Sequence, residues 1–169
     1  MPILNLADVA RGEARVEGQI LPSDPLWEGS EVKLEGPLRV DLRAQSVGEG
    51  VLVRGEMKVR LALECRRCLE PVVRELDDEV TLLFEPLNGE EVADLEGEVY
   101  PLPARGDYVD LGPPLREELI LRLLDYVVCS ESCRGLCPKC GANLNDGTCD
   151  CVPEEESSPW SALKKLKFD

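Results

Sequence analysis

The strongest pattern in the chain is an alternation of apolar and polar residues in its first half. Apolar side chains fall at every second position over 51–63, with Gly55 in register, and over 38–44; the positions between them are charged over 54–60 and over 39–43. Period-two alternation is typical of a strand that buries one face. Because Gly48-Glu49-Gly50 separates the two runs, they predict a long antiparallel hairpin.

Shorter signals of the same kind lie on either side of this hairpin. Residues 14–20 alternate and end at Pro22-Ser23-Asp24-Pro25, which predicts another strand. Val72-Val73 and residues 80–84 predict one or two further strands. Residues 85–106 are acidic and rich in Gly and Pro, with few large side chains, so we expect a mobile loop there.

Helical spacing appears only after residue 110. Leu115, Leu119 and Leu123 repeat at every fourth position, and Glu117 and Glu118 fall in the first turns. The spacing predicts a helix over 115–124 whose leucines belong to the core.

A second, shorter helix is expected at the end of the chain, over 159–168. There Trp160, Leu163 and Leu166 fall on the face opposite to the lysines.

These elements predict an α+β fold in two parts. A mostly antiparallel β domain packed with one main helix is expected over 1–128. A small cysteine-rich segment followed by the short C-terminal helix is expected over 129–169. That segment has too few large apolar side chains for a core of its own, so it needs a cross-link or a metal to hold its shape.

Charge changes this picture in two ways. The formal net charge of -15 argues against indiscriminate nucleic-acid binding, which depends on neutralising phosphates. The charge is uneven, however: residues 75–98 hold ten acidic and no basic residues, and residues 37–74 hold eight basic against five acidic. Both stretches can simply be solvated faces, but each can also be a surface for a partner of opposite charge.

Two absences narrow the chemistry. The chain has no histidine, which excludes Ser-His-Asp and Cys-His nucleophile systems and requires any protein-only zinc site to be nearly all thiolate. No run reaches the roughly 18 apolar residues of a membrane span, and residues 1–8 do not resemble a secretory leader. We therefore expect a cytoplasmic protein with no membrane partner, whose cysteines are metal ligands rather than disulfides.

The sharpest metal motif is Cys137-Pro138-Lys139-Cys140-Gly141. A Cys-x-x-Cys turn ending in glycine points two thiolates at one ion while backbone N–H groups bond the sulfurs. Cys149 and Cys151 follow and can supply the remaining ligands, so a structural zinc site of four thiolates is predicted, with no open position for a catalytic water.

The other four cysteines form a possible second zinc site. Cys65 and Cys68 end the long strand, and Cys129 and Cys133 follow the main helix, so the pairs meet if the helix packs on the sheet. An alternative is one site shared by Cys65, Cys68, Cys137 and Cys140. A redox role for Cys65 and Cys68 is less favoured because the pair follows a strand and does not open a helix.

Several motifs together resemble the YceD family. They are Cys65-Arg66-Arg67-Cys68-Leu69-Glu70-Pro71, the helix segment 117–121, the string from Cys133 to Asn145 with Cys149 and Cys151 behind it, and the tail 159–166. The resemblance implies a role in the accumulation or processing of large-subunit ribosomal RNA, hence in ribosome biogenesis. It supplies no catalytic residue, and no enzyme activity or small-molecule substrate is expected.

The partner expected from this resemblance is large-subunit ribosomal RNA or a basic ribosomal protein. Cations on an exposed strand face and at its end are candidates for RNA phosphates: Arg54, Lys58, Arg60, Arg66 and Arg67. The acidic segment 75–98 can instead hold a basic protein. The alternative function is a zinc-stabilised protein-interaction module that binds a ribosomal protein without touching RNA.

Overall fold

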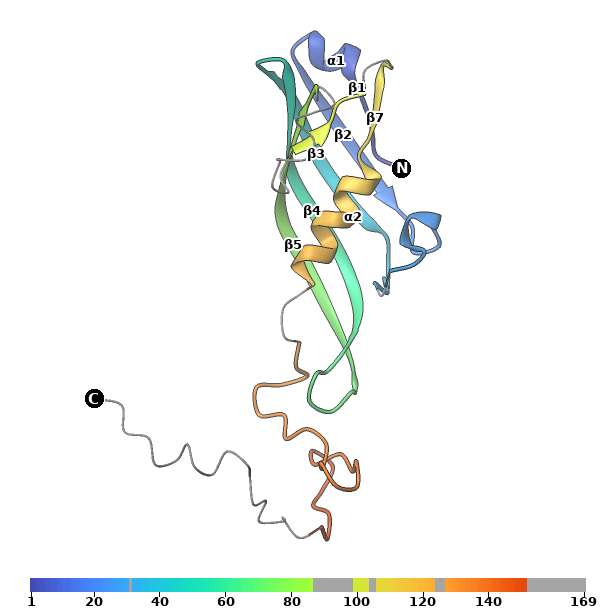
Figure 1. Cartoon of the computed structure of the whole chain (residues 1–169), viewed down its shortest axis with the longest axis vertical. Helices are drawn as coiled ribbons and strands as arrows, with labels where there is room; N and C mark the ends of the chain where they lie inside the picture. Colours follow the sequence, from blue (N-terminus) through green and yellow to red (C-terminus); the bar gives the residue numbers. More distant parts are fainter. Residues whose placement is uncertain (31, 87–98, 104–105, 124–126, 152–169) are drawn as a thin grey trace, which may run out of the picture.

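A five-stranded sheet forms the body of the molecule (Figure 1). The computed structural model describes residues 1–30, 32–86, 99–103, 106–123 and 127–151. In the sheet, neighbouring strands follow the chain order β2, β3, β4, β5, β6, and all pair antiparallel except β5 and β6. The strands are β2 (Glu13–Ile20), β3 (Leu38–Val47), β4 (Gly50–Glu64), β5 (Pro71–Glu85) and β6 (Val99–Pro101).

The predicted hairpin is confirmed and is longer than its sequence signal. β3 and β4 pair from Arg39 opposite Lys58 to Val47 opposite Gly50. Their turn is made by Gly48 and Glu49, and the φ of 60° at Gly48 explains the glycine there. The two short signals beyond residue 71 belong to one 15-residue strand, β5.

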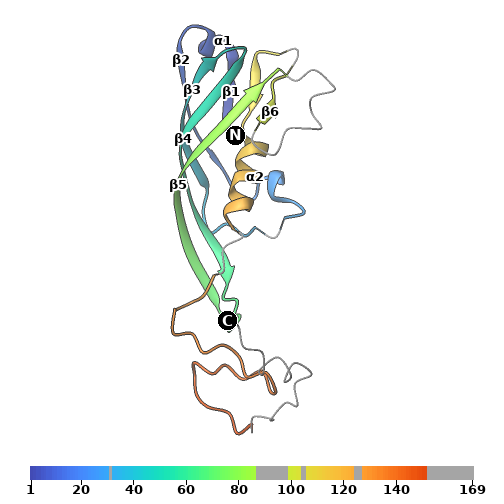
Figure 2. The same ribbon diagram turned by 60° about the vertical axis from the view of Figure 1, so that its left-hand side comes forward.

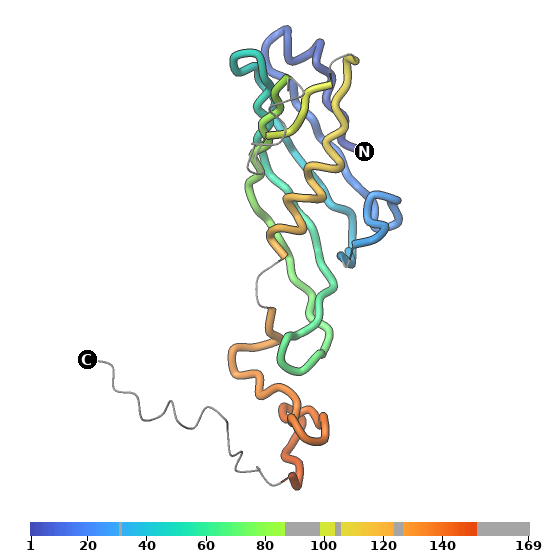
Figure 3. Tube along the Cα trace, viewed as in Figure 1, coloured from blue at the N-terminus to red at the C-terminus, as the bar shows by residue number. Residues whose placement is uncertain are grey.

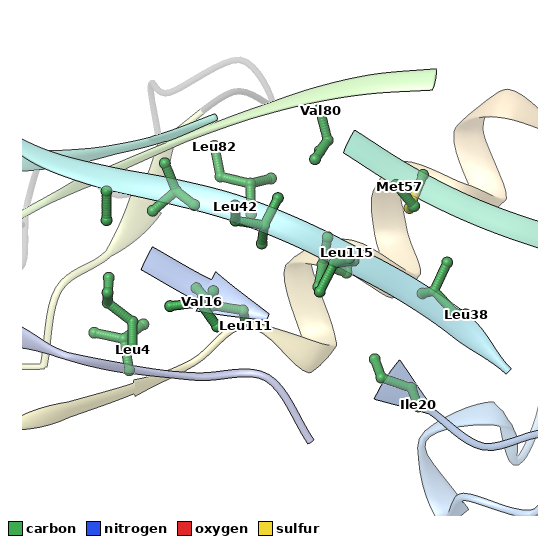
Figure 4. Packing of buried hydrophobic residues seen from close by; sticks show 14 of the residues in the cluster. Leu4, Val16, Ile20, Leu38, Leu42, Met57, Val80, Leu82, Leu111 and Leu115 are labelled. Carbon is green, nitrogen blue, oxygen red and sulfur yellow. The ribbon is translucent and has the colours of Figure 1, made fainter. Parts of the chain in front are cut away.

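One face of the sheet is covered. The N-terminal strand β1 (Ile3–Asn5) pairs with β7 (Tyr108–Asp110) in a two-stranded ribbon, which lies with α1 (Leu6–Ala10), the 3₁₀ turn η1 (Pro25–Trp27) and α2 (Gly112–Arg122) on that side. Figure 4 shows leucines and valines of the sheet facing Leu4, Leu111 and Leu115. The apolar positions of the alternating runs therefore form one core.

The predicted helix is confirmed with shifted bounds. α2 begins at Gly112, three residues earlier than the spacing indicated, and its Leu115 and Leu119 are fully buried. The proline pair Pro113-Pro114 is tolerated because the first turn of a helix needs no backbone donors.

One expectation is wrong in part, and another falls on residues that the structure does not describe. The loop prediction over 85–106 is wrong at Val99–Pro101, which form β6 beside β5, because backbone pairing at a free sheet edge does not require an apolar pattern. Residues 87–98 and the expected helix over 159–168 lie outside the described residues. The class of the fold, α+β with mostly strands, is as expected.

The β4–β5 hairpin reaches well past the end of α2. Seen in Figure 2, its far end curves beneath α2 and reaches the segment that holds the late cysteines. The trace in Figure 3 shows residues 127–151 lying beside and beneath the turn between β4 and β5. The long hairpin therefore carries Cys65 and Cys68 to the cysteine-rich part of the chain.

Candidate metal centres

The turn that joins β4 to β5 contains the first cysteine pair. Cys65 accepts a backbone hydrogen bond from the N–H of Leu69 at 2.9 Å, and its own N–H donates to the carbonyl of Glu70 at 2.9 Å. Leu69 takes a positive φ of 61°. The backbone thus folds tightly enough to point both sulfurs to one side.

The second cysteine pair has the same backbone fold. The N–H of Gly141 donates to the carbonyl of Cys137 at 2.9 Å, and the N–H of Cys137 donates to the carbonyl of Ala142 at 2.8 Å. Gly141 has a φ of 73°. Two turns far apart in the sequence therefore present their cysteines in one geometry.

Each pair meets two more cysteines. We name Cys65, Cys68, Cys129 and Cys133 the hairpin group, and Cys137, Cys140, Cys149 and Cys151 the distal group. Within each group all four sulfurs lie within 4.8 Å of one another. The structure therefore brings together the four cysteines of each predicted site. It places Cys137 and Cys140 in a different group from Cys65 and Cys68, so the shared-site alternative is not the arrangement found.

The hairpin group fits a tetrahedral thiolate site. The Sγ atoms of Cys65 and Cys133 lie 3.7 Å apart, and those of Cys68 and Cys129 lie 3.6 Å apart. A tetrahedron with Zn–S bonds of about 2.3 Å has edges of about 3.8 Å. All eight cysteines are free thiols. The two groups can each hold a metal ion, and a closed set of sulfur donors suits a structural zinc ion.

The two groups differ in burial. Three cysteines of the hairpin group are buried, and they pack with Val72, Val128 and Leu136 in a small apolar cluster. In the distal group only Cys137 is buried, and Cys140 is exposed. The hairpin group is the better shielded of the two from water and from competing ligands.

Thiol ionisation is uneven within each group. Burial raises the pKa of Cys65, but backbone N–H groups of Cys129, Arg67 and Cys68 outweigh it and bring the pKa to about 6. The N–H groups of Cys140 and Lys139 bring the pKa of Cys137 to about 6. Interaction with Cys133 and then Cys68 raises the pKa of Cys129 to about 12. Four thiolates packed this closely repel one another, and a bound cation offsets that repulsion.

The candidate cations on the sheet lie on its uncovered face, which is balanced in charge. Lys58 pairs with Glu56 and Asp77, and Arg60 pairs with Glu35 and Glu75. Because Lys58 and Arg60 are already paired with carboxylates, they attract phosphate less strongly than unpaired cations would.

The charges on this face follow the strand register. Arg15, Arg43 and Arg54 stand in one row across β2, β3 and β4. The next row is acidic throughout, and its members are Glu17, Asp41, Glu56 and Glu79. Arg54 forms no ion pair with any residue that the structure describes, so it is the candidate on this face with the most charge to offer.

The two candidate arginines in the cysteine turn have different surroundings. The Arg66 side chain is exposed, while its backbone N–H donates to the carbonyl of Val127 at 2.8 Å. The guanidinium of Arg67 donates to the carbonyls of Glu131 and Cys133, at 3.2 and 3.1 Å. Arg67 thus ties the hairpin turn to the segment that carries the later cysteines.

Asn145 has a place in the site that residue patterns did not indicate. Its side-chain nitrogen donates to the sulfur of Cys133 at 3.4 Å, and its side-chain oxygen accepts the N–H of Arg134 at 2.8 Å. Burial raises the pKa of Cys133, but hydrogen bonds from the Asn145 amide and the N–H of Gly135 outweigh burial. The pKa of Cys133 is therefore lowered overall. The only signal for this residue was its position in the string that carries the family resemblance.

Fold and site together define a class of protein: an α+β domain whose longest hairpin meets a compact segment in one four-cysteine group, while the segment forms a second such group by itself, and both groups are able to bind metal. The family is shown by comparison of the whole sequence. Residues 53–167 match the model of "Large ribosomal RNA subunit accumulation protein YceD", so the chain belongs to the YceD family. The family name connects the chain with accumulation of large-subunit ribosomal RNA.

Curated relatives cover part of the chain. An uncharacterized protein of Mycobacterium tuberculosis is 38% identical over 108 residues, which are 63% of this chain and 51% of that protein. The chloroplastic "Large ribosomal RNA subunit accumulation protein YCED homolog 1" of Arabidopsis thaliana is 26% identical over 156 residues, which are 78% of this chain and 49% of that protein. The chain spans about half the length of these relatives. No solved structure matches it.

Helices in the described part of the chain are too short or too polar for any of them to cross a bilayer.

Proposed function

We propose that this protein is a non-catalytic ribosome-biogenesis factor that supports the accumulation or processing of large-subunit ribosomal RNA and is stabilised by two structural zinc ions. The observation that carries the zinc part is the convergence of eight cysteines into two compact groups of four. The ribosomal part rests on membership of the YceD family.

A structural role for the metal follows from the donor sets. Four thiolates fill the coordination sphere of zinc and leave no place for a reactive water. Apart from cysteines, no polar or charged side chain is buried among the residues that the structure describes. Enzyme sites usually hold such a group, with a pKa shifted by its surroundings.

The direct partner is large-subunit ribosomal RNA or a basic ribosomal protein. The net charge of -15 and the further negative charge of two zinc–thiolate centres favour a basic protein. Local contact with RNA is supported by Arg54 on the sheet and Arg66 at the hairpin turn.

The function is tested in cells that lack the protein. We expect their ratio of large-subunit to small-subunit ribosomal RNA to fall and to recover when the intact chain is returned. Chains with Cys65→Ser and Cys68→Ser, or with Cys137→Ser and Cys140→Ser, should fail to restore it. A chain with Ser132→Ala, a change in the same segment that removes no metal ligand, should restore it.

The purified chain should contain two zinc ions by metal analysis, and either double cysteine variant should contain fewer. An unchanged ribosomal RNA ratio in the deleted cells contradicts the ribosomal role. An intact chain purified without chelator and free of zinc contradicts the structural metal.

A further inference from the structure

The two cysteine groups are joined by one short stretch of backbone. Cys133 of the hairpin group and Cys137 of the distal group are separated by Arg134, Gly135 and Leu136 only. Leu136 packs against the buried cysteines of the hairpin group, and its N–H donates to the carbonyl of Arg67 at 3.0 Å. The chain therefore enters the distal group already fixed against the hairpin turn.

Gly135 makes this approach possible. Its φ is 74°, and a Cβ atom there would lie 2.9 Å from the carbonyl oxygen of Arg67. Only glycine combines that conformation with so close a contact. A metal held by the hairpin group therefore fixes the backbone from which the first cysteine of the distal group projects.

Asn145 makes a connection in the opposite direction. It lies between Cys140 and Cys149, inside the loop of the distal group, yet its side-chain N–H donates to the sulfur of Cys133 in the hairpin group at 3.4 Å. Asn143 holds this amide in place, because its side-chain oxygen accepts from the side chain and the backbone N–H of Asn145, at 2.8 and 3.0 Å. A metal in the distal group orders the loop that positions this donor.

We propose that Asn145 is a positioning residue that couples the two cysteine groups, so that a metal ion in either group raises the affinity of the other. The proposal rests on the proposed function, in which both groups hold metal. An N–H donor on a ligand sulfur stabilises the thiolate that the metal needs, and loss of such a partner lowers metal affinity by roughly 10–100-fold. Coupling of this kind is reciprocal, with factors of about 5–150 in proteins.

The test uses the full chain and Co²⁺, whose thiolate complexes absorb in the visible range. Cys149→Ser with Cys151→Ser leaves only the hairpin group complete, and Cys65→Ser with Cys129→Ser leaves only the distal group complete. The product of the two stepwise affinities in the intact chain, divided by the product of these single-group affinities, is the coupling factor. We expect a factor of at least about 5.

The role of Asn145 is tested by changing its donor alone. Asn145→Asp keeps an acceptor for the N–H of Arg134 but replaces the N–H donor at Cys133 with a carboxylate, so we expect the coupling factor to fall toward one. Asn143→Ala, which only releases the Asn145 amide, should lower the factor by less. Asp146→Ala, next in the chain and touching no thiol, should leave it unchanged.

The outcomes separate this proposal from the proposed function. A coupling factor of one in the intact chain, with two Co²⁺ bound, overturns the coupling and leaves the structural metals standing. A factor that survives both Asn145→Asp and Asn143→Ala overturns the role of Asn145. Failure of the intact chain to bind Co²⁺ or Zn²⁺ in either group ends both proposals.

Discussion

The residue that follows the second cysteine has a different conformational cost in the two cysteine turns. Their backbone hydrogen bonds match, but the position after the second cysteine, which takes a positive φ in both, holds Leu69 in one and Gly141 in the other. The left-handed conformation costs a residue with a Cβ atom roughly 1–2 kcal/mol. Leu69 is 61% exposed, so little packing offsets this cost. The hairpin turn is thus held in shape against the preference of its own sequence.

Replacing Leu69 with glycine should therefore stabilise the protein. We expect Leu69→Gly to raise the free energy of unfolding of the zinc-loaded chain by about 0.5–1 kcal/mol, since relief of strain exceeds the entropy that glycine adds to the unfolded chain. Denaturant unfolding measures this.

Gly141→Leu is the matched control, because nothing lies within 4 Å of a Cβ atom there and only the conformation resists the change. It should destabilise the chain by about 1 kcal/mol. A stability lowered by Leu69→Gly would mean that the leucine side chain makes contacts that outweigh the strain.

At the scale of elements, the β4–β5 hairpin serves two cores. Its upper part belongs to the main core under α2, and its end belongs to the small cluster around Cys65, Cys68 and Cys133. Among the residues that the structure describes, no hydrophobic core of comparable size supports residues 127–151. Order in that segment is expected to depend on metal, as in other small thiolate modules.

Removal of zinc should disorder the cysteine-rich segment and leave the main sheet folded. With a strong chelator and a reductant present, backbone amides of residues 127–151 and of the turn 65–70 should lose hydrogen-exchange protection, while those of β3 and the paired part of β4 keep it. Zinc returned in slight excess should restore the pattern. Equal protection throughout the chelated, reduced chain would show that the segment holds its shape without metal.

At the scale of the whole molecule, basic and acidic side chains are placed in an ordered way on the uncovered face of the sheet. The chain is strongly acidic, but on this face a row of arginines lies beside a row of acidic residues, and ion pairs join basic and acidic side chains within and between rows. A surface of this kind offers phosphates few free cations. Contact with RNA, where it occurs, should depend on Arg54 and Arg66 more than on Lys58 and Arg60.

Charge reversal at these two arginines tests the RNA contact. If the chain binds large-subunit ribosomal RNA directly, Arg54→Glu with Arg66→Glu should weaken binding by at least tenfold in about 0.1 M salt and flatten its salt dependence. Filter binding or fluorescence anisotropy measures both quantities.

Arg11→Glu, a reversal of an exposed arginine that lies far from Arg66 and is paired with Asp8, should have a much smaller effect. Arg67 is left intact because it supports the backbone around Cys133. RNA binding that survives the double reversal with its salt dependence unchanged would remove this surface. Binding of a basic ribosomal protein in place of RNA would mean that the negative charge of the chain serves to bind that protein.

How much the sequence determines differs between these scales. The alternation over 38–63 predicted the long hairpin, and the leucine spacing predicted α2, because each pattern reflects burial of one face within a single element. The grouping of the cysteines into two sets of four was also predicted, from their spacing and from their places after the long strand and the main helix. β1, β6 and β7 carried no pattern, because strands of three residues are defined by the partners beside them.

The sequence by itself determined the long strands and the main helix, and it predicted that the cysteines are metal ligands, since hydrophobic periodicity and thiol spacing are local properties. Only the tertiary structure decided that Lys58 and Arg60 are neutralised, that Arg67 supports the cysteine segment, and that Asn145 reaches the sulfur of Cys133. These facts depend on strand register and on the approach of segments distant in the chain. Such contacts are fixed by the packing of the whole fold, which no local pattern records.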